Sequence, residues 1–323
     1  MESRKEVNLE QGLELRNVIL TGATGMIGLA LIDELIARKV FVTAVYRPDS
    51  RRLCSIPKHP LVETVACELS DLARLSDRLT RSYDAFFHLG WDGSVGAAAR
   101  NDIDIQNRNI LYSLDAVYAA AKLHCKVFIG AGSQAEYGRV DGILRVDTAC
   151  SPETAYGAAK HRASDMTRIE CEKLGLRQCW ARILSVYGPG DADGTLIMTL
   201  IRSFLSQQIP ACTLGDQLWD YLYCIDAARA LLAIAEYGRH GTKYPLGSGT
   251  SRPLREYICA VRDAIDPNLP IRFGELPYSD QQIMHLCADL TELTEETGFV
   301  PKISFEEGIR RTIANVQTGR QVQ

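Results

Sequence analysis

The sequence predicts an α/β fold in which helices cover both faces of a doubly wound parallel sheet. Two observations support this prediction. Short apolar or β-branched runs alternate with longer amphipathic segments through residue 185, and the first run leads through a glycine-rich turn directly into a helical pattern. The alternation weakens afterwards, so we expect one sheet unit over residues 1–185. Residues 186–323 should form mainly a smaller α/β cap, with some elements returning to the sheet.

Each expected strand is short and is followed by a helical pattern. The expected strands cover residues 18–20, 40–46, 61–67, 84–89, 127–131 and 178–184. The expected helices cover residues 27–36, the segment after residue 71 through about residue 81, 101–122 and 152–174. In the cap, we expect helices over 195–209 and 227–237, an extended segment over 219–225, and short helices with loops from residue 255 onward. Strands joined by helices run parallel with right-handed crossovers, so their carboxyl ends meet at one ligand-binding edge of the sheet.

The glycine-rich turn follows the strand at residues 18–20 and carries Gly22, Gly25 and Gly28 at three-residue spacing. Gly22 suits a tight turn, Gly25 lets a pyrophosphate approach the backbone, and Gly28 lets the helix pack closely on the strand. Unpaired N–H groups at the start of the following helix attract an anion. The spacing differs from the usual GxGxxG, but the strand before it and the helix after it supply the expected context. The sequence therefore predicts a Rossmann-type, dinucleotide-binding sheet.

The end of the strand at residues 40–46 bears on the choice of coenzyme. In dinucleotide-binding folds an acidic residue here binds the ribose 2′-hydroxyl, whereas an arginine accommodates a 2′-phosphate. Arg47 directly follows the strand, and Arg51 and Arg52 lie close behind. No acid stands at the strand end itself, although Asp49 is near enough to be recruited. We therefore expect NADP(H), with NAD as the alternative; a solvated basic loop is the non-functional interpretation.

Three polar side chains are expected to meet at the ligand-binding edge. Tyr156 and Lys160 are four residues apart on one expected helix, so they share a face, and Ser133 follows the strand at 127–131. A lone Tyr-x-x-x-Lys is a weak signal, but the combination with Ser133 is more specific. The trio suits proton transfer coupled to hydride transfer by a nicotinamide. A phenol with a pKa of about 10 needs a nearby ammonium to stabilise its phenolate, and the Ser133 hydroxyl would hold the substrate oxygen.

At these residues the sequence resembles the extended short-chain dehydrogenases/reductases that modify nucleotide sugars, the NAD-dependent epimerase/dehydratase family. The resemblance covers nearly the whole chain. It is carried by T-G-A-T-G-M-I-G, His88-Leu89-Gly90, Ser133 with Tyr137-Gly138, Tyr156 with Lys160, Arg182 with Tyr187-Gly188-Pro189, and the C-terminal segment C-A-D-L-T-E-L-T-E-E-T-G-F.

The resemblance implies that Ser133, Tyr156 and Lys160 are catalytic and that Lys160 also binds the nicotinamide ribose. It further implies a homodimer built from the helices at about 101–122 and 152–174. The candidate cofactor-binding residues are Gly22, Thr24, Gly25, Met26, Ile27, Gly28, Arg47, Glu68, Leu69, His88, Leu89, Gly90, Tyr156, Lys160 and Leu184.

Departures from the family narrow the expected reaction. Where its 4,6-dehydratases carry an Asp-Glu pair after the catalytic serine or threonine, this chain has Gln134 and Ala135, and Glu136 is offset by one position. A 4,6-dehydratase is therefore not expected. Ser185 and Trp219 stand where many relatives have an asparagine and a diphosphate-binding arginine; Trp219 could stack on a base or sugar, or belong to the core. The candidate substrate-binding residues are Trp91, Ser133, Gln134, Ser185 and Trp219.

The sequence gives weaker support for a functional role of four further residues. His88 follows an apolar strand, so a hydrogen-bonded core histidine is the first interpretation. Asn107 could position a water or Lys160, with Asn109 as its rival and a solvated amide as the alternative. Trp91 lies in the loop after the strand at 84–89 and could shape a sugar pocket or merely anchor that loop.

Composition excludes several classes of function. The 323 residues carry a net charge of −4 with no basic stripe, which argues against a nucleic-acid partner. No apolar run approaches the length of a membrane span, and residues 1–15 lack the apolar core of a signal peptide. Ten cysteines without a CxxC pair indicate reduced thiols, and the six histidines show no metal-ligand spacing. We therefore expect a cytoplasmic protein without a metal site and without a membrane partner.

Three functional hypotheses follow. The first is an NADP(H)-dependent reductase of a nucleotide-linked 4-keto-6-deoxy sugar. The second is a nucleotide-sugar 4-epimerase that uses the same trio with tightly bound NAD. The third, from another class, is a protein that senses NAD(P) and has lost catalysis; such proteins usually lack the tyrosine or the lysine, and this chain has both.

Overall fold

A seven-stranded, all-parallel sheet forms the centre of the protein in a computed structural model that describes residues 12–140, 142–279 and 282–318. The strand order is β11-β7-β5-β4-β1-β2-β3. The strands are β1 (Asn17–Thr21), β2 (Phe41–Tyr46), β3 (Val62–Ala66), β4 (Ala85–His88), β5 (Val127–Ser133), β7 (Arg177–Ile183) and β11 (Lys243–Leu246). The chain reverses its direction of winding between β1 and β4, and the carboxyl ends of these two strands border the crevice where ligands of open α/β sheets bind. The predicted fold class is confirmed.

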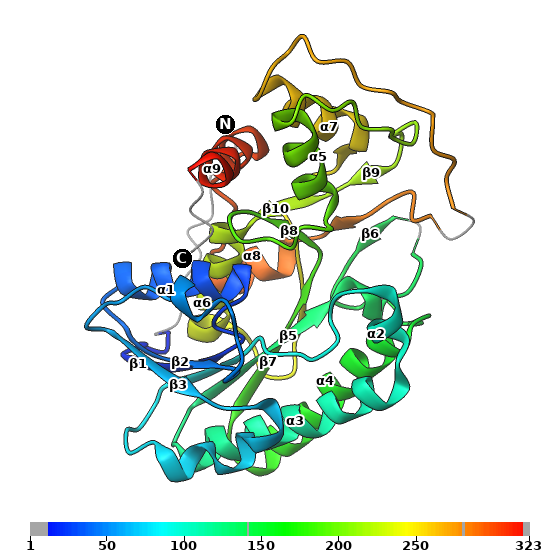
Figure 1. The fold of residues 1–323 in the computed structure, drawn as a ribbon. Coiled ribbons are helices and arrows are strands. Elements are labelled where there is room, and N and C mark those ends of the chain that lie inside the picture. The colour runs from blue at the N-terminus through cyan, green and yellow to red at the C-terminus, as the bar shows by residue number, and fades with distance from the viewer. Residues whose placement is uncertain (1–11, 141, 280–281, 319–323) are drawn as a thin grey trace, which may run out of the picture.

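Helices cover both faces of the sheet (Figure 1). On one face lie α1 (Met26–Ala37) and α6 (Cys224–Tyr237), which pack against each other. On the other lie α3 (Ile103–Lys122), α4 (Ala155–Lys173) and the 3₁₀ segment η2 (Leu69–Arg78). Alternation along the strands separates two cores, because successive side chains point to opposite faces. Val18 and Leu20 of β1 pack beneath α1 and α6, whereas Ile19 packs with Phe86 and Phe128 on the α3 side.

Short strands and three helices form a second group of elements beyond the carboxyl edge of the sheet (Figure 1). The helices are α5 (Leu196–Leu205), α7 (Leu254–Asp263) and α9 (Phe305–Gln317), and α8 (Thr291–Thr297) packs against α6. The paired strands are β8 (Ser185–Tyr187) with β10 (Tyr221–Tyr223), β9 (Leu218–Trp219) with β12 (Arg252–Pro253), and β6 (Ile143–Leu144) with β13 (Cys287–Ala288). Elements on either side of residue 185 contribute to the other group. β11 and α6 belong to the sheet unit, whereas β6 pairs with β13 in the second group.

Several predicted boundaries were wrong. The segment expected to be helical through about residue 81 forms 3₁₀ turns that end at Arg78. The helix expected over 101–122 begins at Ile103, because the Asp102 carboxylate caps it by accepting the N–H groups of Asp104 and Ile105; a separate α2 (Ala97–Asn101) precedes it.

Three further boundaries differ. The helix expected over 152–174 begins at Ala155, where the Thr154 hydroxyl accepts the N–H of Gly157. The helix expected over 195–209 ends at Leu205, and Cys224, predicted to be extended, begins α6. Two short 3₁₀ turns, η1 (Leu53–Ser55) and η3 (Gln134–Glu136), complete the description. Most of the N-terminal segment that lacks the apolar core of a signal peptide, residues 1–11, lies outside the described residues.

Candidate active site

The turn between β1 and α1 has the geometry of an anion-binding loop. Gly22 has φ +71°, and a Cβ atom there would lie 2.8 Å from the Gly90 nitrogen. A Cβ on Gly28 would lie 2.3 Å from the Gly22 carbonyl oxygen, so only glycine allows α1 to pack this closely on the turn. Gly25, at the start of α1, supplies no side-chain cap. The first N–H groups of α1 are therefore left for a ligand, and the residues fit a dinucleotide pyrophosphate.

Two adjoining pockets run from this turn along the carboxyl edge of the sheet. A pocket of about 590 Å³ is lined by Thr24, Arg47, Glu68, Leu69 and Gly90, among others. A second pocket of about 300 Å³ is lined by residues that include Met26, Ile27, Gly28, Ser133, Tyr156, Lys160 and Leu184. Gly22, Gly25, Leu89, Trp91 and Ser94 line both. All the candidate cofactor-binding residues except His88 thus line one of the two pockets.

His88 lies beneath the pockets rather than in them. It is 2% exposed, its Nδ1 is 2.9 Å from the Thr21 hydroxyl, and its Nε2 is 3.3 Å from the Ser113 hydroxyl. Burial, together with the charge of Lys160, lowers the pKa of His88 to about 3, so the ring stays neutral. The structure supports the interpretation of His88 as a hydrogen-bonded core histidine.

Tyr156 and Ser133 are neighbours on the wall of the smaller pocket. Ser133 is the last residue of β5, and Tyr156 lies in the first turn of α4, with 8% of its surface exposed. Burial raises the pKa of the Tyr156 phenol, whereas a hydrogen bond with Ser133 and the charge of Arg100 act in the opposite direction. The structure therefore places the expected proton donor beside the expected oxygen-holding hydroxyl.

Lys160 lies one turn further along α4 than Tyr156. Its Nζ donates a hydrogen bond to the Ala131 carbonyl (2.6 Å) and lies 3.7 Å from the centre of the Trp91 ring. The distance from Nζ to the centre of the Tyr156 ring is 5.8 Å. Burial lowers the pKa of Lys160 to about 7. That this ammonium stabilises the Tyr156 phenolate stays a prediction.

The loop after β4 forms the opposite wall and is fastened to α3. The Trp91 indole nitrogen donates to Gln106 Oε1 (2.9 Å), and its ring meets that of Tyr156 edge-on, with centroids 6.1 Å apart. Asn109 accepts the Asp92 N–H (2.8 Å) and donates to the Asp92 carbonyl (2.9 Å). The buried asparagine that supports the site is thus Asn109, whereas Asn107 is exposed.

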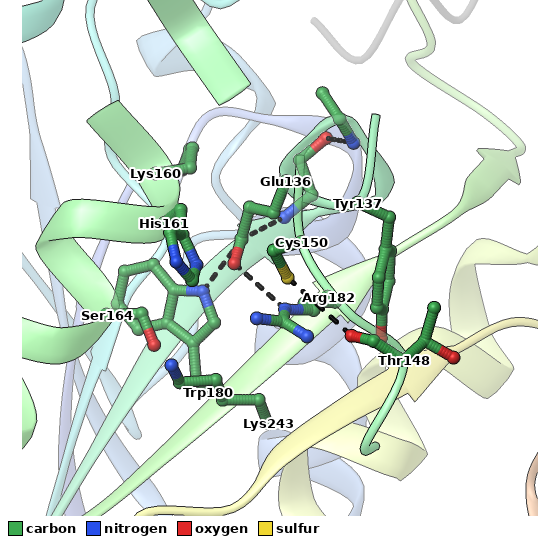
Figure 2. Close-up of polar contacts among 12 residues, drawn as sticks. Glu136, Tyr137, Thr148, Cys150, Lys160, His161, Ser164, Trp180, Arg182 and Lys243 are labelled. Atoms are coloured by element: carbon green, nitrogen blue, oxygen red, sulfur yellow. Dashed lines mark hydrogen bonds and ion pairs between the residues drawn. The ribbon is translucent and has the colours of Figure 1, made fainter. Parts of the chain in front are cut away.

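Glu136 sits beneath the site in a fully buried ion pair. Its Oε2 accepts from Arg182 Nε (2.9 Å), and its Oε1 accepts from the Trp180 indole (2.9 Å) and from the Ser133 N–H (2.8 Å). Figure 2 shows the carboxylate held between Trp180 and Arg182, below Lys160 on α4. With the Ser133 hydroxyl accepting the Ala135 N–H (3.2 Å), the pair forms a capping box. Glu136 therefore fixes the position of Ser133 and is not available as a solvent-facing acid.

The loop after β2 with Arg47 and Asp49, which we call the coenzyme rim, is exposed to solvent, whereas the wall around Tyr156 is buried. Arg47 is exposed, and its Nε lies 2.7 Å from Asp49 Oδ1. Arg52 donates to the Gly190 carbonyl (2.7 Å), and the Ser50 hydroxyl lies 3.4 Å from that of Thr24. Arg47 lines the larger pocket, but Asp49 is held beside it.

Comparison with known proteins identifies the family. The model of the NAD dependent epimerase/dehydratase family matches residues 18–247. The chain belongs to this family. It is 25% identical to a dTDP-glucose 4,6-dehydratase of Neisseria gonorrhoeae, over 92% of this chain and 94% of that protein. It is 23% identical to a dTDP-4-dehydro-6-deoxyglucose reductase of Escherichia coli, over 93% of this chain and 97% of that protein.

The fold is similar to that of the UDP-N-acetylglucosamine 4-epimerase from Methanobrevibacter ruminantium M1, with a TM-score of 0.84 and 24% identity. The similarity covers 94% of this chain and 99% of that one. The resemblance stated from the motifs and the prediction of an NAD(P)-dependent enzyme are both confirmed at the level of the family.

Two of the candidate substrate-binding residues, Ser185 and Trp219, lie on β8 and β9. The Trp219 indole donates to the Ser185 hydroxyl (2.9 Å), so these two candidate residues are partners. Trp219 is half-buried, and Gln134 is half-buried directly after Ser133. Asp220, next to Trp219, is fully buried and accepts N–H groups from Ser248, Gly249 and Ala288.

Sequence reasoning missed two residues that shape the site. Arg100 on α2 lies over the Tyr156 ring, and Gln106 on α3 ties Trp91 to α2. No local motif marks either one, because both contact residues that are distant in sequence.

Within the described ranges, no helix is long and apolar enough to cross a membrane. In that same part of the chain, His, Cys, Asp and Glu side chains form no group of three or more that could hold a metal ion.

Proposed function

We propose that the protein is an NADP(H)-dependent reductase of a nucleotide-linked 4-keto-6-deoxy sugar, with Tyr156 as the proton donor. The observation that carries this proposal is the juxtaposition of Ser133 and Tyr156 on a pocket continuous with the uncapped start of α1. The similarity over most of its length to a 4-dehydro-6-deoxyglucose reductase supports the substrate class.

In the proposed reduction, each residue of the site has a distinct role. A reduced nicotinamide held by these residues would supply the hydride for the keto carbon. The Ser133 hydroxyl holds the carbonyl oxygen, and Tyr156 gives that oxygen its proton and becomes a phenolate. Lys160 would turn from the Ala131 carbonyl to the nicotinamide ribose. Trp91 closes the wall beside Tyr156 and keeps water from the reacting atoms.

Dehydration is disfavoured by the residues after Ser133. A 4,6-dehydratase needs an acid and a base that remove water from the sugar, and this chain places Gln134 and Ala135 there. The nearby carboxylate of Glu136 is paired with Arg182 and fully buried. The similarity to a dehydratase in overall sequence therefore does not extend to the groups that the reaction requires.

Epimerisation at C4 is the second candidate, and one observation favours it. Asp49 is held beside Arg47 at the coenzyme rim, where a carboxylate could bind the 2′-hydroxyl of NAD. An epimerase would oxidise and re-reduce the same carbon with the same trio, so its cofactor would not be consumed.

Cofactor stoichiometry tests the proposal. The reductase should consume one NADPH per sugar with a 4-keto-6-deoxy sugar nucleotide, measured as loss of NADPH absorbance. Interconversion of two sugar nucleotides without net loss of NADPH, together with NAD that co-purifies, would establish the epimerase and overturn the reductase.

We also propose a cytoplasmic homodimer whose interface lies on α3 and α4. These helices pack against each other and expose the large apolar side chains Ile103, Leu111, Tyr118, Ile169 and Leu174. All ten cysteines are free thiols, which suits a reducing compartment. Sedimentation of wild type and of Leu111→Glu tests the interface. We expect the wild type to be a dimer and the variant to be a monomer, and a monomeric wild type would reject the interface.

We also propose that residues 1–185 form the cofactor unit and that residues 186–323 form mainly the substrate cap. Limited proteolysis with and without each ligand tests that division.

A further inference from the structure

Arg100 places a positive charge on the face of the proposed proton donor. Its guanidinium carbon lies 4.3 Å from the centre of the Tyr156 ring, nearer than Lys160 Nζ at 5.8 Å. Among the described residues Arg100 forms no ion pair, so no described carboxylate neutralises this charge. A cation over an aromatic face is attracted to the ring, and the attraction grows when the ring carries the negative charge of a phenolate.

The position of Arg100 is fixed by hydrogen bonds from a buried side chain. Gln106, which is 1% exposed, donates from Nε2 to the carbonyls of Ala99 (2.9 Å) and Gly93 (3.1 Å). Its Oε1 accepts from Trp91, which meets Tyr156 edge-on. One glutamine therefore ties both α2 and the Trp91 wall to α3, and Arg100 is half-buried against the phenol as a result.

Three charged groups face Tyr156 from the elements packed around it. Arg100 from α2 favours the phenolate, and Glu136 from η3 opposes it. Lys160, on α4 itself, is directed at the Ala131 carbonyl and the Trp91 ring. The hydroxyl of Ser133 adds an uncharged hydrogen bond. In this arrangement Arg100 is the cation placed closest to the ring.

We propose that Arg100 stabilises the phenolate of Tyr156 across the ring face and so sets the pH range in which Tyr156 exchanges a proton with the substrate. The inference rests on the proposed role of Tyr156 as proton donor. In the reduction, the O–H bond of Tyr156 breaks, a new O–H bond forms on the sugar oxygen, and the electron pair stays on the phenolate beneath Arg100. Arg100 acts through Tyr156 and not on the substrate.

The pH profile of the reverse reaction tests this proposal. With oxidised cofactor and the sugar alcohol, activity requires the phenolate, so kcat should rise with pH through the kinetic pKa of Tyr156. Arg100→Gln should move this limb upward by about one pH unit, which is about a tenfold loss of kcat below the limb, with little change in KM. Arg100→Lys keeps the charge without the planar group and should shift the limb less. Arg108→Gln, which removes an exposed charge from α3, should leave the profile unchanged.

A spectroscopic titration provides a readout that does not depend on turnover. The tyrosinate absorbance of the complex with oxidised cofactor, after subtraction of the same titration of Tyr156→Phe, reports Tyr156 alone. Its midpoint should move upward in Arg100→Gln by the same amount as the kinetic limb. An unmoved midpoint and limb would overturn the proposal, as would a rise in KM alone, which would make Arg100 a substrate contact. If Tyr156→Phe itself keeps normal turnover, the proposed function fails instead, whatever Arg100 does.

Discussion

The wall of the site around Tyr156 and the rim around Arg47 are built in opposite ways. Tyr156 and Lys160 are nearly inaccessible to water, and burial shifts the pKa of both. Arg47 and Asp49 are 61% and 74% exposed in their side chains and form a surface ion pair. Buried charges interact strongly and in a fixed geometry, whereas exposed pairs are weak and easily rearranged. We therefore expect the chemistry to depend on the buried wall, and the choice of coenzyme to depend on an exposed rim that a ligand can remodel.

The largest expected effect comes from removing the hydroxyl of Tyr156, the proposed proton donor in the wall. Tyr156→Phe should lower kcat by about 10²–10⁴-fold, the range for loss of a general acid, while the Kd for NADPH stays nearly unchanged. Steady-state kinetics and fluorescence titration of NADPH measure the two quantities. Normal turnover in this variant would assign the proton transfer to another group.

Protein stability should depend on the buried ion pair of Glu136 and Arg182 beneath the wall. Glu136→Gln leaves Arg182 buried without a counter-charge and should lower the free energy of unfolding by about 3–5 kcal/mol. Glu153→Gln is the matched control, since it breaks an exposed pair with Arg139 and should cost about 0–1 kcal/mol. Urea denaturation of both variants checks the contrast. Equal losses would mean that burial does not distinguish the two ion pairs.

Lys160 should make stability depend on pH in a defined direction. Its pKa in the folded protein is about 7, whereas an unfolded lysine titrates at about 10.4. Between these values the unfolded chain binds more protons, so this residue makes the free energy of unfolding rise with pH. Lys160→Met should remove that rise, and the difference in stability from wild type should change steadily from about pH 7 to about pH 9. A difference that stays constant over this interval would show that Lys160 is not held with a depressed pKa.

The smallest expected effect lies at the rim. Arg47→Ala should weaken NADP(H) by about tenfold and NAD(H) by much less, because the 2′-phosphate loses a charge-assisted contact worth about 1.4 kcal/mol. Lys58→Ala, which removes an exposed cation that lines neither pocket, is the control. Equal weakening of both coenzymes in Arg47→Ala would remove the argument for NADP(H) and favour Asp49 as the ribose ligand.

Local patterns predicted the sheet, its glycine turn and the positions of Ser133, Tyr156 and Lys160. They succeeded because strand periodicity, turn geometry and four-residue helix spacing depend on neighbours in sequence. The start of α3 was misjudged although Asp102 is a strong helix cap, and the capping box of Ser133 and Glu136 was also visible in the sequence as S-x-x-E. Arg100 and Gln106 could not be predicted, since their roles depend on where α2 packs against α4. The direction of Lys160 toward the Ala131 carbonyl likewise depends on tertiary contacts.

The most direct test of this account is a crystal structure of the enzyme with oxidised cofactor and the nucleotide-linked sugar alcohol. The account predicts that the C4 oxygen of the sugar lies within about 3 Å of both the Tyr156 and the Ser133 hydroxyl oxygens, with C4 facing the nicotinamide. A sugar bound with that oxygen beyond the reach of Tyr156, or a diphosphate bound away from Gly22 and Gly25, would contradict it.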